Sequence, residues 1–139
     1  MKRNHIAQHE AAHAVVAQRM GLPVSWVSID SGYEEGIHFA AAVKIPDELI
    51  DMERDKLAIC VSMAAPSHIQ THRHVAPALW RYAQMEADLA YEIAGRAGIT
   101  FDEVYDLSEN LISEHWPEIV TLAHRLEDEG KVEYDLAVA

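Results

Sequence analysis

Glycine and proline residues divide this chain into segments of helical length, and this division constrains its fold more than any other feature. Between them, apolar side chains recur at spacings of three and four, which is typical of amphipathic helices. Gly21, Gly98 and Gly130 each follow such a segment, as a glycine does at the end of a helix. The pattern predicts helices over residues 3–20, 47–65, 77–97, 101–113 and 117–129. We expect Pro66 to end or kink the second of these helices.

Two segments between the first and second predicted helices have strand character. Residues 24–30 are rich in β-branched and aromatic side chains, which favour strands. Residues 31–36 form a predicted turn, and residues 37–45 could return as a second strand that completes a hairpin. The last nine residues are expected to form a short strand or a tail. The predicted fold class is therefore α+β and mostly helical: one helix, a small hairpin or sheet, and a C-terminal helical bundle.

Length and composition indicate one globular domain over residues 1–139. The chain has 139 residues, of which 50% are hydrophobic, enough to build a core. Its net charge is -12, and the charge is uneven: residues 1–81 hold 9 acidic and 8 basic side chains, and residues 82–139 hold 14 and 3. Binding to nucleic acid or to an anionic membrane needs clustered Lys and Arg, so neither is expected as a partner.

Cysteine content and hydropathy indicate in which cellular environment the protein is expected. The single cysteine, Cys60, excludes an intramolecular disulfide framework and Cys-rich zinc fingers. No apolar run approaches the roughly 18–20 residues that span a bilayer, and the N-terminal residues do not resemble a signal peptide. We expect no membrane insertion and a cytoplasmic location.

The first predicted helix carries the motif His9-Glu10-Ala11-Ala12-His13, which matches H-E-x-x-H. Residues four apart lie on one face of a helix, so the two imidazoles can bind one Zn²⁺ ion. Glu10 lies beside them, where it can take a proton from a water molecule on the metal. Two histidines, a third protein ligand and a water molecule make the open arrangement of a catalytic zinc site.

The third ligand is not fixed by the motif. The metzincin extension H-x-x-G-x-x-H is absent, because Val16 and Arg19 stand at its Gly and second His. A distant carboxylate is the remaining option. Glu86 and Asp88 both lie in the helix predicted from Pro77, but residues two apart do not share a helical face. The residues alone leave both acids open.

The segment Ile6–Ala17, followed by Gly21-Leu22-Pro23-Val24 and Val27-Ser28-Ile29, resembles the peptidase domain of FtsH-type zinc metalloproteases. In that family the third ligand is an Asp far downstream, in a helix reading roughly Asp-Leu-x-x-Ala-x-x-x-Ala. Asp88-Leu89 matches its start, and Ala94 lies downstream, although the first alanine falls at position 90 rather than 92. The resemblance therefore implies Zn²⁺ bound by His9, His13 and Asp88, with Glu10 as catalytic base.

The resemblance implies a zinc-dependent metallopeptidase that hydrolyses peptide bonds in flexible polypeptide segments. The strand at 37–45 is the edge expected to pair with an extended substrate. We expect no ATPase domain of the kind found in that family, so the protein could act alone or with an unfoldase or adaptor, as a monomer or small homo-oligomer. The alternative is a non-catalytic zinc-binding or regulatory protein that keeps the fold. Ala12 replaces a family glycine, and Met63-Ala64-Ala65-Pro66-Ser67 replaces a Gly-Gly-Arg-Ala-like stretch.

A second group of histidines, His68, His72 and His74, lies between Pro66 and Pro77. His68 and His72 are four residues apart and could bind a metal if they were helical. No carboxylate lies near them in the sequence, so a cluster without a ligand is the favoured interpretation. A second metal site and a role in the substrate cleft are the alternatives.

Overall fold

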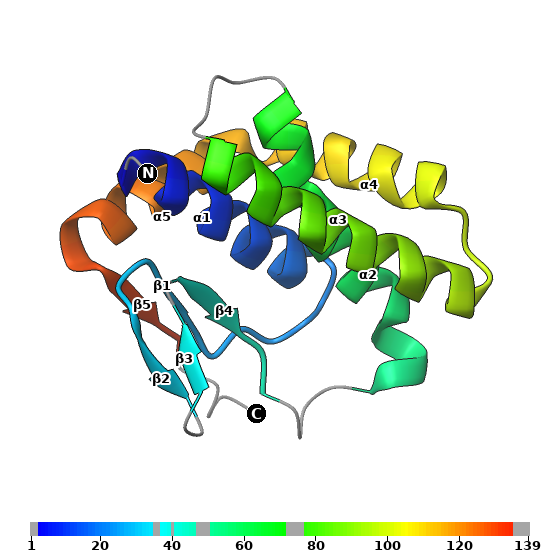
Figure 1. The fold of residues 1–139 in the computed structure, drawn as a ribbon, viewed down its shortest axis with the longest axis horizontal. Coiled ribbons are helices and arrows are strands. Elements are labelled where there is room, and N and C mark those ends of the chain that lie inside the picture. Colours follow the sequence, from blue (N-terminus) through cyan, green and yellow to red (C-terminus); the bar gives the residue numbers. More distant parts are fainter. Residues whose placement is uncertain (1–2, 35–36, 40, 47–50, 72–76, 135–139) are drawn as a thin grey trace.

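The computed structural model describes residues 3–34, 37–39, 41–46, 51–71 and 77–134, and within them the chain is mostly helical. The helices are α1 (Arg3–Arg19), α2 (Met52–Thr71), α3 (Pro77–Ala97), α4 (Phe101–Glu114) and α5 (Trp116–Glu129). The strands are β1 (Trp26–Ser28), β2 (Gly32–Glu34), β3 (Ile37–Phe39), β4 (Ala42–Lys44) and β5 (Lys131–Glu133). The predicted α+β, mostly helical class is confirmed, and the small sheet lies to one side of the helices (Figure 1).

Three strands from distant parts of the sequence form the main sheet, in the order β4-β1-β5. The central strand β1 is antiparallel to both neighbours, and Val27 is opposite Val43 on one side and Val132 on the other. β2 and β3 form a separate two-stranded ribbon. The predicted single strand at 37–45 is therefore wrong in its extent, because residues 37–39 pair with β2 and only residues 42–44 pair with β1.

The helix boundaries follow local signals that the sequence carries. Thr100 caps α4, where its Oγ1 accepts a hydrogen bond from the Glu103 backbone amide at 3.3 Å. Gly130 ends α5 with a positive φ of 78°. Pro66 does not end α2 as expected, since the helix continues through it to Thr71.

Helix α1 is enclosed on nearly all sides, which explains why it carries so many alanines. Its buried residues include the unbroken run from His9 to Ala17, and successive residues of such a run point in all directions around the helix. Small side chains let neighbouring elements approach closely, and α1 packs against α2, α5 and the sheet. The residues of the H-E-x-x-H motif are therefore held inside the protein rather than on its surface.

In the described parts of the chain, none of the helices has both the length and the apolar character that crossing a bilayer requires.

Candidate metal centre

The two histidines of the motif lie on the buried part of α1. His9 is 1% exposed and His13 is 8% exposed. Their rings meet edge to face, with centroids 5.2 Å apart. The spacing of four residues in a regular helix produces this arrangement, and both rings direct their Nε2 atoms toward helix α3.

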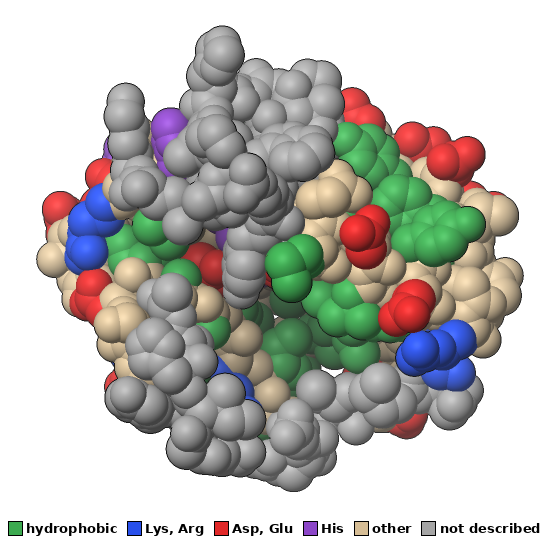
Figure 2. Space-filling view, viewed as in Figure 1, with side chains coloured by type: hydrophobic (Ala, Val, Ile, Leu, Met, Phe, Trp, Pro, Cys, Tyr) green, Lys and Arg blue, Asp and Glu red, His purple; other side chains and the backbone are tan. Residues whose placement is uncertain are grey.

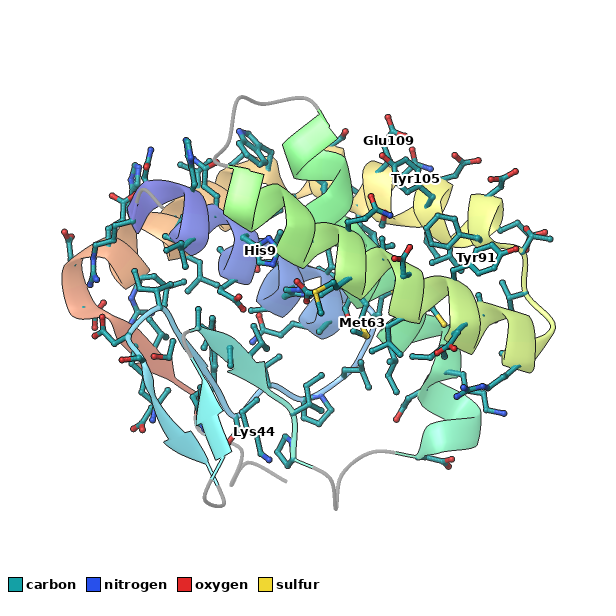
Figure 3. All side chains as sticks on the ribbon, in the orientation of Figure 1. His9, Lys44, Met63, Tyr91, Tyr105 and Glu109 are labelled. Atoms are coloured by element: carbon teal, nitrogen blue, oxygen red, sulfur yellow. The ribbon has the colours of Figure 1, made fainter. Side chains whose placement is uncertain are left out.

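The side chain that meets these two nitrogens is Glu86 of α3. Its Oε1 lies 2.7 Å from His9 Nε2, and its Oε2 contacts His13 Nε2. The three ligand atoms that these residues can offer all lie within 4.8 Å of one another. Residues 77 positions apart in the sequence thus converge on one point, and Figure 3 shows His9 beneath the ribbon of α3.

The electrostatics of this group are those of a buried charge cluster. Burial would raise the pKa of Glu86, but the two histidines outweigh it and lower that pKa to about 2. Burial would lower the pKa of His13, but the Glu86 charge outweighs it and raises that pKa to about 9. Burial dominates at His9 and lowers its pKa. In the absence of a metal, the charge of Glu86 is therefore balanced mainly by a protonated His13.

Glu10 lies beside this cluster without joining it. Its Oε1 is 4.0 Å from His9 Nε2, and the residue is 2% exposed. Burial raises the pKa of Glu10 to about 7, although the charge of His13 acts in the opposite direction. Such a carboxyl can take up and release a proton at neutral pH.

Asp88, which the resemblance implied as the third ligand, is not brought to the histidines. It is exposed on the outer side of α3, where its Oδ1 accepts a hydrogen bond from Gln84 Nε2 at 3.1 Å. The reason is that the side chains of residues two positions apart in a helix point in directions that differ by more than half a turn. With Glu86 on the inner side, Asp88 points away, and the carboxylate that the structure brings to the two histidines is that of Glu86.

A signal in the sequence could have identified Glu86. The buried alanines of α3 are Ala83, Ala87, Ala90 and Ala94, spaced by four, three and four residues. Glu86 lies four and eight positions before the last two, at the edge of this buried face, whereas Asp88 does not. The two alanines of the family pattern also fall at positions 90 and 94 when Glu86 is taken as the acid.

A cavity of about 260 Å³ opens beside the cluster. Glu10, His13 and Glu86 form its polar end, and its walls come from α1, α2 and β4 (Ala17, Ala42, Val43, Ile45, Ile59, Ser62 and Met63). On the face seen in Figure 2 the surface is hollowed between the helices and the sheet, and green apolar atoms line the hollow. A polar cluster at the end of an apolar cavity is typical of ligand sites.

The chemistry of these donors fits a zinc ion. Two imidazole nitrogens and one carboxylate oxygen are a common ligand set of catalytic zinc. His13 Nε2 is buried and has no hydrogen-bond partner of normal geometry among the described residues, so a metal would satisfy it. Ser62 of α2 lines the same cavity beside His13.

The second histidine group predicted from the sequence falls on residues whose side chains the structure does not describe. His72 and His74 lie outside the described residues, as does the side chain of His68.

Comparison with known proteins does not identify the chain. No protein-family model matches its sequence, and no curated protein is significantly similar to it.

Proposed function

We propose that this protein is a zinc-dependent metallopeptidase, with His9, His13 and Glu86 as metal ligands and Glu10 as general base. The observation that carries the proposal is the convergence of two imidazoles and a carboxylate from separate helices, next to a second buried carboxyl and an open cavity. A structural cluster would not need Glu10, because burying its carboxyl costs free energy, and the distance of 4.0 Å to His9 Nε2 is too long for a hydrogen bond that would offset this cost.

A bound zinc ion would supply a Lewis acid that polarises the scissile carbonyl and lowers the pKa of a water molecule toward about 7. Glu10 accepts the proton of the attacking water and later donates it to the leaving amine. Its pKa of about 7 suits both steps, since the same carboxyl must first accept and then donate a proton. His9 and His13 hold their Nε2 atoms toward the metal position, and Glu86 supplies the negative charge there.

The surroundings favour an extended polypeptide as substrate. β4 is an outer strand of the described main sheet, and its residues Ala42 and Val43 line the cavity. An extended segment could add to this edge through backbone hydrogen bonds and place an apolar side chain against Ile59 and Met63. Pairing of this kind needs an unfolded segment, so folded substrates would require an unfoldase or adaptor.

Glu10→Gln tests the proposal, because it keeps the shape of the side chain and removes the base. We expect cleavage of an unstructured protein such as casein to fall by about 10²- to 10⁴-fold while one equivalent of zinc stays bound. Zinc content is measured by atomic absorption on the same samples. Glu114→Gln, which changes an exposed acid outside the site, is the matched control and should cleave as the wild type does.

Two results would contradict the proposal. Binding of zinc without cleavage of casein or of a broad peptide library would favour the non-catalytic, zinc-binding alternative. Equal cleavage by the wild type and by Glu10→Gln would show that another group acts as the base.

A further inference from the structure

The outer side of α3 exposes large apolar side chains. Met85 is 68% exposed, Leu89 is 42% exposed and Tyr91 is 66% exposed, and no other large hydrophobic side chain among the described residues is exposed to this extent. α3 packs against α2 with its inner side and contacts α4 near its end. Exposed apolar side chains are ordinary when they are scattered, but a group of them on one helix is typical of a protein–protein interaction site.

Aromatic rings extend this apolar surface from α3 to α4. The ring centroids of Tyr91 and Phe101 are 5.6 Å apart, and those of Phe101 and Tyr105 are 6.1 Å apart. Phe101 and Tyr105 are themselves partly exposed, and Figure 3 shows Tyr91 on the side of α3 that faces α4. Together Met85, Leu89, Tyr91, Phe101 and Tyr105 form what we call the α3–α4 surface, which spans two helices.

Acidic side chains lie among these apolar ones. Around the axis of α3, positions 88 and 92 lie between Met85 and Tyr91, and both are exposed acids. From residue 84 to residue 114 the chain has eight acidic side chains and one basic side chain, Arg96, which is paired with Glu92 at 3.7 Å. Figure 2 shows red acidic side chains next to green apolar ones over α3 and α4. The exposed acids of the two helices are Asp88, Glu92, Asp102, Glu103, Asp106 and Glu114.

This charge determines which kind of partner fits. A second copy of the chain would bring the same acids against this surface, and like charges across an interface oppose association. A neutral apolar segment would cover Met85 and Tyr91, but it would remove neighbouring carboxylates from water without giving them a partner, which costs free energy. A segment that combines apolar side chains with Lys or Arg meets both demands.

We propose that the α3–α4 surface docks a basic amphipathic segment of a partner protein. The apolar side chains of that segment cover Met85, Leu89 and Tyr91, and its Lys or Arg side chains pair with the acids beside them. An amphipathic helix with apolar residues three and four positions apart presents side chains in this way. The inference is independent of the proposed function, because none of these side chains belongs to the candidate metal centre.

A synthetic peptide of about 18 residues, with Leu on one helical face and Lys on the other, is a suitable probe, because shorter isolated helices are only marginally stable. Two control peptides separate the contributions: one has Ser in place of Leu, and the other has Gln in place of Lys. We expect the amphipathic basic peptide to bind at least about tenfold more tightly than either control at low salt, and its affinity to fall as salt is added. Fluorescence anisotropy measures binding to metal-free protein, so that the peptide is not cleaved.

Matched variants locate the contact on the protein. Asp88→Asn and Asp128→Asn each remove one negative charge from an exposed helical position, but only Asp88 lies beside the α3–α4 surface. We expect the first to weaken binding about threefold and the second to leave it nearly unchanged. Met85→Gln keeps the length of the side chain and should weaken binding at least about fivefold, because less apolar area is covered. His124→Gln, at an exposed position of α5, is its control and should bind as the wild type does.

Three results would overturn the proposal. Equal weakening by Asp88→Asn and Asp128→Asn would mean that the net charge of the protein attracts the peptide without a defined site. Amide NMR shifts that the peptide causes at β4 and α2 rather than at α3 and α4 would place it in the metal-site cavity. A dimer in light scattering that Met85→Gln dissociates would identify a second copy as the occupant.

Discussion

Two carboxylates of α3 that lie two positions apart have opposite surroundings. Glu86 contacts both histidines of α1, and Asp88 contacts Gln84 at the surface. Removing the charge of Glu86 should therefore remove a metal ligand and leave His13 without its buried counter-charge, whereas the same change at Asp88 should alter only the surface.

We expect Glu86→Gln to weaken zinc binding by at least about 100-fold and Asp88→Asn to change it by less than about twofold. Competition titration with a chelator of known affinity measures both variants. If Asp88→Asn strips the zinc and Glu86→Gln does not, the ligand implied by the family resemblance is the true one and the geometry described above does not hold zinc.

The raised pKa of His13 gives metal binding a pH dependence. Glu86 raises that pKa to about 9, so His13 is protonated at neutral pH without metal and must lose this proton to bind zinc. Zinc affinity should therefore rise about tenfold per pH unit at neutral pH and level off near pH 9. Calorimetry in buffers of different ionisation enthalpy should show about one proton released at pH 7.5. Release of no proton would mean that His13 is neutral in the free protein.

The same shift has the opposite effect on the metal-free fold. A histidine whose pKa is higher in the folded than in the unfolded state stabilises the fold fully below 6.5, and this stabilisation is lost as the pH rises toward 9. Raising the pH thus favours metal binding while it weakens the fold that has no metal.

Among the elements, the junction of α5 and β5 depends on one glycine. Gly130 has a φ of 78°, and a Cβ placed there would lie 1.9 Å from Asp30 Oδ2. Asp30 is also paired with Arg3 at 3.1 Å, so moving its side chain would disturb a second contact. A side chain at position 130 would therefore have to displace the Asp30 carboxylate.

Gly130→Ala should lower the free energy of unfolding by about 2 kcal/mol or more, since the strain of the left-handed backbone adds to the clash. Gly98→Ala is the matched control, because Gly98 has a similar φ of 73° but nothing within 4 Å of an added Cβ. It should cost about 1 kcal/mol. Urea unfolding of the three proteins measures both values, and equal losses would show that the contact with Asp30 is unimportant.

Local signals predicted the elements well and their partners less well. The cap at Thr100 and the start of α3 at Pro77 depend on neighbouring residues, and the structure confirms both. Pro66 does not end α2, which continues to Thr71 and packs against α1, α3 and α4. The pairing of β1 with β5 joins residues about a hundred positions apart, and no local pattern specifies it.

The candidate site also combines features that neighbouring residues predict with features that depend on distant residues. The motif of His9, Glu10 and His13 is a local pattern, and the structure places its three side chains as that pattern predicts. Choosing between Glu86 and Asp88 required knowing which side of α3 is buried, and this depends on how α3 packs on α2.

Across the whole molecule, the net negative charge is concentrated in the C-terminal part of the chain. Residues 82–139 carry 14 acidic and 3 basic side chains, and the acids are mostly exposed. Figure 2 shows acidic side chains over the visible face of α3 and α4. Like charges on one surface repel each other, so this part of the fold is under electrostatic strain at low ionic strength.

Salt should therefore stabilise the protein. Raising NaCl from about 0.01 M to 0.5 M shortens the Debye length from about 30 Å to about 4 Å, and we expect the Tm of the metal-free protein to rise by several degrees. Differential scanning fluorimetry measures the shift. A Tm that falls or stays constant would indicate that surface ion pairs such as Arg19–Glu118 outweigh the repulsion.

The enclosure of α1 has a consequence for synthesis of the protein. Among the described helices α1 comes first in the chain, and it packs against α5, which comes after the other four. While α5 has not yet left the ribosome, the part of α1 that α5 covers is open to chaperones and to other nascent chains. The ligand set also needs Glu86, so a nascent chain has no complete metal centre until α3 has emerged. The proposed peptidase site would therefore be incomplete, and unable to cleave the chain's own N-terminal half, until α3 has been made.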